Sequence, residues 1–130
     1  MLALMSHAQR VLVVDDQDSM RQLLCSALRG LGYTQIVTAT DGASALTMLR
    51  GRMIDAMLLD VEMPGMGGLE CLRTLRGDPE IAHTPVVMVT GRASESLINA
   101  IRPLVVAGYL IKPVTATALQ AALARIWSKN

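Results

Sequence analysis

The chain has 130 residues, of which 52% are hydrophobic and 18% charged, and this composition is that of one globular domain. Its 12 basic and 11 acidic residues give a formal net charge of +1, and only 2% of the residues are aromatic. A composition with so little net charge and so few aromatic residues does not suit the basic surface or the base-stacking platforms of nucleic-acid-binding domains. We therefore expect no direct binding of nucleic acid. No apolar stretch approaches the roughly 20 residues that a membrane helix needs, so we expect no membrane partner.

The two cysteines and the first residues bear on the cell compartment. Cys25 and Cys71 each lie in a helix-like pattern beside a leucine, which favours buried thiols in a reducing compartment over a disulfide. The segment 1–9 has no charged stretch before its short apolar run, so it does not read as a signal peptide. We interpret it as a flexible lead before a domain of residues 10–130, in a cytoplasmic protein.

The first predicted unit is a strand, an acidic turn and a helix. Val11–Val14 is a short apolar, β-branched run, typical of a strand buried on both faces of a parallel sheet. The polar turn Asp15–Ser19 follows. Apolar residues then recur at helical spacing from Met20 to Leu31, and Gly30 and Gly32 supply stop signals.

The same alternation continues along the chain, so the sequence predicts five strand–helix units. A strand followed each time by a helix indicates a parallel sheet with helices on both faces, wound by right-handed crossovers into a doubly wound α/β fold. The strands are expected at 11–14, 35–39, 56–59, 85–89 and 108–111, and the helices at 20–31, 45–49, 69–75, 94–102 and 118–126.

Polar side chains follow four of these strands. Asp15 and Asp16 follow the first strand, Asp60 the third, Thr90 the fourth and Lys112 the fifth. In an open parallel sheet, ligands bind outside the carboxyl ends of the strands, so we expect these side chains to share one edge. Any one of them could be a solvated loop charge or a helix cap, but core packing does not require the whole set.

The chemistry of this set favours phosphoryl transfer. Three clustered carboxylates repel one another unless a cation lies among them, and hard oxygen ligands without histidine or cysteine select Mg²⁺ over Zn²⁺. A carboxylate is also a nucleophile that forms an aspartyl phosphate. An ammonium and a hydroxyl beside it are what a transferred phosphoryl group needs around its oxygens.

At this point the sequence resembles the receiver domains of two-component response regulators, of the CheY type. The resemblance covers Arg10 to about Trp127, and it implies a flavodoxin-like sheet of order 2-1-3-4-5, the order known for CheY. The segments that carry it are Val11–Asp16, Ser19–Arg21, Asp41–Leu46, Leu58–Met66, Pro85–Thr90 and Gly108–Pro113.

The resemblance implies a role for each acidic residue of the set. Asp60 matches the phosphoacceptor. Asp15 and Asp16 match the acidic pair that holds Mg²⁺ together with Asp60, and the backbone carbonyl of Glu62 matches a further metal ligand.

Three other residues match the parts of a receiver that respond to phosphorylation. Lys112 matches the lysine that pairs with the phosphoryl group, and Thr90 the hydroxyl that moves toward it. Tyr109 matches the aromatic that swings inward with this hydroxyl. The alternative interpretation is an aromatic residue that is half-buried for packing alone.

The resemblance therefore implies a signalling switch and not an enzyme. A histidine kinase or phosphotransfer protein would donate the phosphoryl group to Asp60. The switch would then act on a downstream protein through the face formed by the fourth helix, fifth strand and fifth helix, as a monomer or as a dimer formed on activation.

Three alternatives remain beside this switch. One is a receiver that works as a scaffold without phosphorylation. A second is an aspartyl-phosphate phosphatase, although such chains carry an Asp where this one has Glu62, and a cap domain besides. A third is a flavodoxin-like cofactor carrier, although the acidic turn Asp15–Asp18 lacks the small residues that cradle a phosphate.

The chain departs from the receiver pattern at two places. Glu62 is an acidic residue two positions after the phosphoacceptor, and we hypothesise that it tunes the lifetime of the phosphoryl group, the alternative being a solvated loop charge. Pro103 ends the helix before the fifth strand. Leu104–Val106 has bulky apolar side chains at positions where receiver domains often have small residues. These residues belong either to the core or to an exposed patch for a partner.

Overall fold

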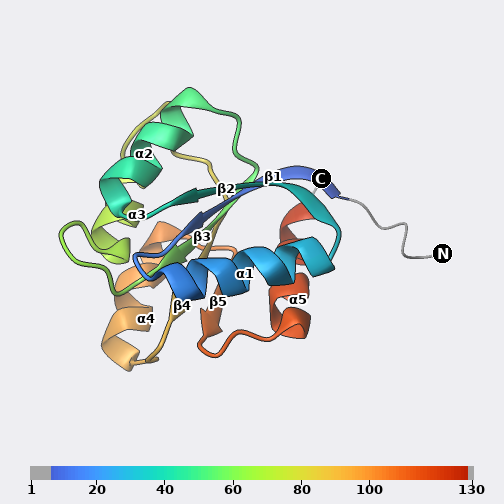
Figure 1. Cartoon of the computed structure of the whole chain (residues 1–130). Coiled ribbons are helices and arrows are strands. Elements are labelled where there is room, and N and C mark those ends of the chain that lie inside the picture. Colours follow the sequence, from blue (N-terminus) through green and yellow to red (C-terminus); the bar gives the residue numbers. More distant parts are fainter. Residues whose placement is uncertain (1–6, 129–130) are drawn as a thin grey trace.

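The computed structural model describes residues 7–128, which form a five-stranded sheet covered by helices on both faces (Figure 1). Residues 1–6 of the expected lead lie outside the described residues. The elements in chain order are β1 His7–Val14, α1 Asp18–Gly30, β2 Tyr33–Ala39, α2 Gly42–Gly51, β3 Ala56–Asp60, α3 Gly68–Arg76, β4 Val86–Thr90, α4 Glu95–Ile101, the 3₁₀ turn η2 Arg102–Leu104, β5 Gly108–Ile111 and α5 Ala116–Trp127.

The sheet has the predicted topology. Its strands lie in the order β2-β1-β3-β4-β5, and all four strand pairs are parallel. Helices α1 and α5 cover one face, and α2, α3 and α4 cover the other (Figure 1). The doubly wound α/β fold expected from the sequence is confirmed.

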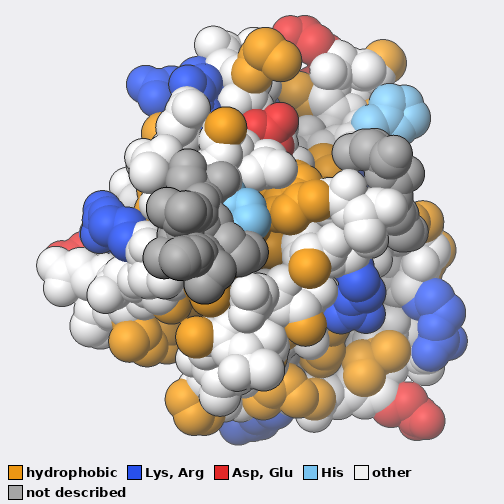
Figure 2. Space-filling view, turned by 90° about the vertical axis from the view of Figure 1, so that its right-hand side faces the viewer, with side chains coloured by type: hydrophobic (Ala, Val, Ile, Leu, Met, Phe, Trp, Pro, Cys, Tyr) orange, Lys and Arg blue, Asp and Glu red, His pale blue; other side chains and the backbone are white. Residues whose placement is uncertain are grey.

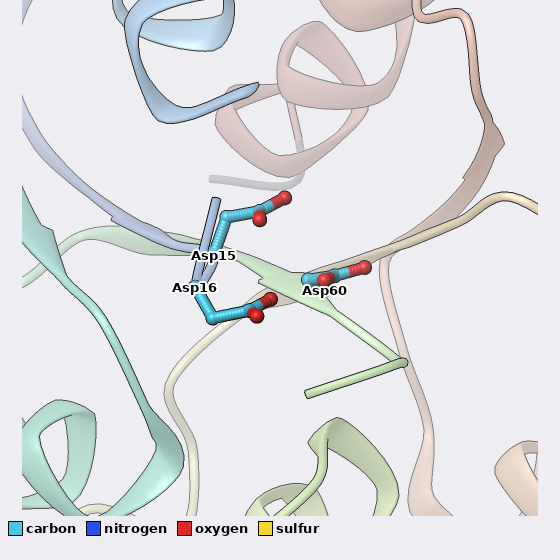
Figure 3. A group of neighbouring side chains, drawn as sticks. All are labelled: Asp15, Asp16 and Asp60. Atoms are coloured by element: carbon cyan, nitrogen blue, oxygen red, sulfur yellow. The ribbon is translucent and has the colours of Figure 1, made fainter. Parts of the chain in front are cut away.

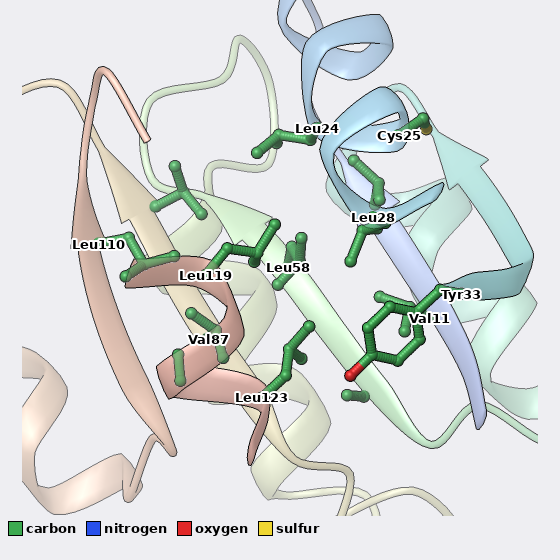
Figure 4. Close-up of a cluster of buried hydrophobic side chains, with 14 of the residues drawn as sticks. Val11, Leu24, Cys25, Leu28, Tyr33, Leu58, Val87, Leu110, Leu119 and Leu123 are labelled. Carbon is green, nitrogen blue, oxygen red and sulfur yellow. The ribbon is translucent and has the colours of Figure 1, made fainter. Parts of the chain in front are cut away.

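Alternating strand residues divide the interior into two cores. In β3, Leu58 packs into the core under α1 and α5, whereas Met57 and Leu59 pack into the core under α2, α3 and α4. Figure 4 shows the first of these cores, where Leu119 and Leu123 of α5 lie against Leu58. Burying one such side chain contributes about 1.5–3 kcal/mol. Central strands that are apolar on both faces are therefore what the two helical layers require.

Strand β1 begins at His7, earlier than the domain boundary expected at residue 10. Residues 7–9 extend β1 beyond the part that pairs with β3, which starts at the pair Val11 and Ala56. The extension pairs with β2 alone, where the His7 amide donates to the Gly32 carbonyl at 2.9 Å. The His7 ring also stacks on Tyr33, with ring centroids 4.2 Å apart. Residues 7–9 have a neighbouring strand on one side only, so they need not be apolar. The search for apolar runs therefore did not predict this part of β1.

The segment that leads into β5 differs from a simple loop. Helix α4 has only seven residues and passes into η2 at Arg102, and the next residue, Pro103, has no amide hydrogen to continue the helix. Leu104 and Val106 pack against the second core, and Val105 between them is 74% exposed. The apolar connector is thus mostly core, with one side chain in solvent.

The surface has no single dominant type of side chain on the face shown in Figure 2. On the face shown in Figure 2, basic, acidic and hydrophobic side chains lie interspersed over the described residues, in keeping with the small net charge. Both cysteines, Cys25 and Cys71, are free and buried as expected. Among residues 7–128, no helix has the length and apolar character that a membrane crossing demands.

Gly68 permits a close approach between α3 and the end of β3. Its amide donates to the Val61 carbonyl at 3.0 Å. A Cβ atom at this position would lie 2.1 Å from the Asp60 carbonyl oxygen and 2.8 Å from the Val61 Cα atom. Backbone atoms cannot move aside as a flexible side chain does, so the first turn of α3 fits against β3 only with glycine here.

We therefore expect Gly68→Ala to lower the free energy of unfolding by about 1–3 kcal/mol, the usual range for overpacking a tight site. Urea denaturation measures this change. Gly77→Ala at the other end of α3 is the matched control, because its Cβ would meet its nearest neighbour at an ordinary 3.6 Å. Equal denaturation midpoints for the two variants would contradict the prediction.

Candidate functional site

Four strands bring the expected site residues to one edge of the sheet. Asp60 and Thr90 are the last residues of β3 and β4, while Asp15 and Lys112 directly follow β1 and β5. The ends of β3 and β4 are offset by one residue, since Asp60 pairs with Val89, the residue before Thr90. Parallel strands that end together thus place chemically different side chains within reach of one another.

Three carboxylates converge at this edge. Ligand oxygens of Asp15, Asp16 and Asp60 all lie within 4.8 Å of one another, and Figure 3 shows the side chains pointing the same way from the ends of β1 and β3. Asp15 is 0% exposed and Asp60 2% exposed, whereas Asp16 faces solvent. The site therefore has two buried acids and an open, acidic entrance.

Asp15 is held in place by its own turn. Its amide donates to the Ala39 carbonyl at 3.2 Å, and its Oδ1 accepts from the Gln17 amide at 2.9 Å. The Arg21 side chain donates to the Asp15 carbonyl at 2.9 Å and also contacts Asp18. An aspartate that accepts from the amide two residues on is typical of turns, and here it orients the carboxylate before α1 begins.

Lys112 is the cation of the site. Its Nζ lies 3.1 Å from Asp60 Oδ1 and 3.4 Å from Asp15 Oδ2. Asp60 Oδ1 is buried, and the contact with Lys112 is an ion pair without a well-aligned hydrogen bond from any described residue. One ammonium between two carboxylates leaves the cluster with an excess of negative charge.

Burial and, each to a smaller extent, the neighbouring charges shift the pKa values of the cluster. Burial raises the pKa of Asp60 to about 6; contact with Lys112 opposes the rise, and the charges of Asp15 and Glu62 reinforce it. Burial lowers the pKa of Lys112, but its contacts with Asp60 and Asp15 outweigh this and raise it above the ordinary value. Lys112 therefore stays charged at neutral pH, and a further positive charge near Asp60 would be favourable.

Glu62 contacts the hydroxyl of Thr90, a link that sequence patterns did not reveal. The Thr90 side chain is fully buried, and its Oγ1 lies 2.9 Å from Glu62 Oε2 and 3.0 Å from the Arg92 carbonyl. A hydroxyl has one hydrogen, so it donates to one of these acceptors at a time. The Gly91 amide donates to Glu62 Oε1 at 3.4 Å. Glu62 is therefore more than a solvated loop charge.

Tyr109 turns its hydroxyl into the protein. The ring packs against the core under α2, α3 and α4, and its hydroxyl is buried without a hydrogen-bond partner among the described residues. Burial raises the pKa of Tyr109, and the negative charge of Glu62 adds to the rise. Thr90, Glu62 and Tyr109 thus form a group beside the acidic cluster, and an unpartnered buried hydroxyl in it indicates a conformation held by packing.

Sequence reasoning missed one residue and one contact that shape this edge. Gly68 brings the first turn of α3 against the Asp60 carbonyl, although the sequence placed it only in a loop. A glycine where a better helix former would suit the first turn was the signal available. The contact is that of Glu62 with Thr90, which could not be predicted because it joins the loop after β3 to the last residue of β4.

The chain is similar to known receiver proteins over nearly its whole length. Residues 11–124 match the family model described as "Response regulator receiver domain". Chemotaxis protein CheY of Pseudomonas aeruginosa is 38% identical over 120 residues, covering 92% of this chain and 97% of that protein. Chemotaxis protein CheY-3 of Vibrio cholerae is 36% identical over 129 residues, covering 99% of each.

Solved structures agree with this similarity. The chemotaxis protein CheY4 of Vibrio cholerae superposes with a TM-score of 0.84 at 32% identity, covering 92% of this chain and 99% of that one. The matched segment includes each residue of the acidic cluster as well as Thr90 and Lys112. This chain belongs to the response regulator receiver domain family.

Proposed function

We propose that this protein is a phosphorylation-controlled signalling switch whose phosphoacceptor is Asp60. The observation that carries the proposal is the setting of its carboxylate, which is buried beside two further acids and 3.1 Å from the Lys112 ammonium. A histidine kinase or phosphotransfer protein would be the donor, and both proteins would meet in the cytoplasm. The chain would be a signalling protein that accepts a phosphoryl group, and not an enzyme that turns over a substrate.

The acceptor step follows from the chemistry of the carboxylate. An oxygen of Asp60 would form a bond to phosphorus as the bond from phosphorus to the donor nitrogen breaks, and that nitrogen would keep the electron pair and take up a proton. The Lys112 ammonium lies where it would pair with an oxygen of the transferred group. The product is an acyl phosphate on Asp60.

The acidic cluster fits Mg²⁺. All of its donors are carboxylate oxygens, which Mg²⁺ prefers, and Asp60 Oδ1 is a buried oxygen that no described residue satisfies with a hydrogen bond. Asp15, Asp16 and Asp60 would hold the ion, with the backbone carbonyl of Glu62 as a further ligand. Bound there, Mg²⁺ supplies positive charge that neutralises the oxygens of the phosphoryl group.

The response would run from Thr90 to Tyr109 and the face formed by α4, β5 and α5. A phosphoryl oxygen on Asp60 would compete with Glu62 for the single hydroxyl hydrogen of Thr90. Ile98 of α4 and Ile111 of β5 are large hydrophobic side chains that remain exposed on this face. They suit the docking of a downstream protein, or of a second copy in an activation-dependent dimer.

One observation favours a second candidate, a receiver that signals without phosphorylation. Thr90 already has a carboxylate partner in Glu62, and the Tyr109 hydroxyl is already buried. An inward arrangement that exists before phosphorylation is what a constitutive scaffold would use. The aspartyl-phosphate phosphatase alternative gains nothing from the geometry, because the Glu62 carboxylate is committed to Thr90 and Gly91.

The first prediction concerns the acceptor. Incubation with Mg²⁺ and a small phosphodonor such as acetyl phosphate should add one phosphoryl group to the wild-type chain, read by intact mass. Asp60→Asn should gain none, and a chelator should abolish the gain. Labelling of Asp60→Asn would place the acceptor elsewhere, and a wild type that no donor or kinase labels would favour the scaffold.

A second prediction concerns stability and pH in the metal-free protein. The folded-state pKa of Asp60, about 6, lies above the ordinary value of 3.8, so folding takes up a proton between these values. The neutral form is favoured at low pH, and stability falls by about 3 kcal/mol as the pH rises from about 4 to above 6.

Asp60→Asn removes this titration, so it should be more stable than the wild type above pH 6 and similar to it near pH 4. Urea denaturation in a chelator at both pH values measures the difference. Adding Mg²⁺ at pH 7 should then stabilise the wild type more than Asp60→Asn, because a ligand of the folded state alone stabilises it. A constant difference across this pH range would contradict the prediction.

A third prediction concerns Glu62. If its carboxylate competes with the phosphoryl group for Thr90, Glu62→Gln should change the rate of dephosphorylation, measured by loss of the phosphoryl mass after the donor is removed. Glu70→Gln on α3 is the matched control, since that side chain is also acidic and exposed but lies outside the site. An unchanged rate in Glu62→Gln would show that Glu62 has no part in the lifetime.

A further inference from the structure

The side chain of Arg76 joins two connectors at the end of the sheet opposite the acidic cluster. Arg76 is the last residue of α3, and its guanidinium donates to four backbone carbonyls. Two belong to the segment before β4, where Ala82 and Thr84 accept at 3.0 and 2.7 Å. Two belong to the segment before β5, where Leu104 and Val105 accept at 2.7 and 2.9 Å.

These four contacts are more than a basic residue at a helix end requires. An arginine in the last turn complements the helix dipole while its head stays in water. Here the head is half-buried, and each carbonyl would lose a partner if it were removed. An arginine suits this task because its planar fork presents five N–H donors in fixed directions, whereas a lysine presents three at one point.

The connector that Arg76 holds contains a strained residue. Val105 has φ 53° and ψ 83°, in the left-handed region, which a β-branched residue rarely adopts. Such a backbone persists only where its surroundings determine it. The surroundings here are the packing of Leu104 and Val106 on one side and the bonds from Arg76 to the Leu104 and Val105 carbonyls on the other.

The two segments tied by Arg76 lead into the two strands that carry Thr90 and Tyr109. After the connector, the Ala107 amide donates to the Val86 carbonyl at 2.8 Å, and Tyr109 then pairs with Met88. The start of β5, and with it the ring of Tyr109, is therefore placed by how the connector meets the start of β4. No other described side chain bonds to both segments.

We propose that Arg76 is a positioning residue of the switch, which holds the connector before β5 in its strained form and so keeps the ring of Tyr109 turned inward. The proposal rests on the proposed function only in assigning Tyr109 to the switch. It is distinct from the chemistry at Asp60, because Lys112 is anchored at the far end of β5, where its amide donates to the Thr90 carbonyl at 2.8 Å.

The test follows Tyr109 directly. The chain has two tyrosines, Tyr33 and Tyr109, so fluorotyrosine labelling gives two ¹⁹F NMR signals, assigned with Tyr109→Phe. In Arg76→Lys we expect the Tyr109 signal to shift or split, because the ring samples more than one position, while the signal of Tyr33 stays unchanged. Arg73→Lys, an exposed arginine on the same helix, should leave both signals unchanged.

A second variant separates positioning from simple support. Arg76→Ala should lower the melting temperature by about 10 °C, and it could fail to fold, since four carbonyls lose their donor and three of these bonds are partly buried. Glycine adopts the left-handed conformation without steric cost, so adding Val105→Gly to Arg76→Lys should restore a single Tyr109 signal.

The outcomes are distinct from those for the acceptor. A single, unshifted Tyr109 signal in Arg76→Lys would overturn the proposal, even if the melting temperature falls, because the arginine would then only support the fold. A split signal that Val105→Gly does not restore would also overturn it. Phosphoryl uptake in Arg76→Lys should stay at one group per chain, whereas a wild type without uptake would count against the proposed function alone.

Discussion

Two carboxylates, those of Asp15 and Asp60, are buried next to each other, and the rest of the site is arranged around their repulsion. A buried charge is tolerated only when it is paired, and Lys112 is shared between both acids. Burial raises the pKa of Asp60 more than Lys112 lowers it, so the ammonium does not fully compensate the cost of burying this carboxylate. A site in this condition favours the arrival of more positive charge, such as the metal ion that the proposed phosphoacceptor would use.

The sheet is what makes such a cluster stable. Its central strands are apolar on both faces, so two separate cores hold the strand ends in register from both sides. The burial of many apolar side chains, each contributing about 1.5–3 kcal/mol, outweighs the unfavourable electrostatics of one edge. Because Gly68 also lets α3 begin directly against β3, the Asp60 backbone has little freedom to relieve the repulsion by moving away.

Much of this arrangement could be predicted from the sequence, because it depends on chain order. Four strands of four to eight residues bring Asp15, Asp60, Thr90 and Lys112 to one edge whatever the details of packing, because each of these residues ends its strand or directly follows it. The features that could not be predicted depend on side chains meeting across loops. Glu62 reaches Thr90 from another connector, and Arg76 reads in the sequence as an ordinary basic residue ending a helix.

In the proposed switch, the contact with Glu62 would be one of two alternatives for the Thr90 hydroxyl, the other being a phosphoryl oxygen on Asp60. The hydroxyl of Thr90 has one hydrogen, and in this conformation a carboxylate and a carbonyl already compete for it. The buried Tyr109 hydroxyl lacks a partner among the described residues, and an unsatisfied polar group of this kind costs about 1–3 kcal/mol. Such a cost would make an inward ring less favourable relative to an outward one, whose hydroxyl would reach water. In the proposed switch, a charge change at Asp60 would bias the position of this ring, because a bistable element responds to a local change in charge.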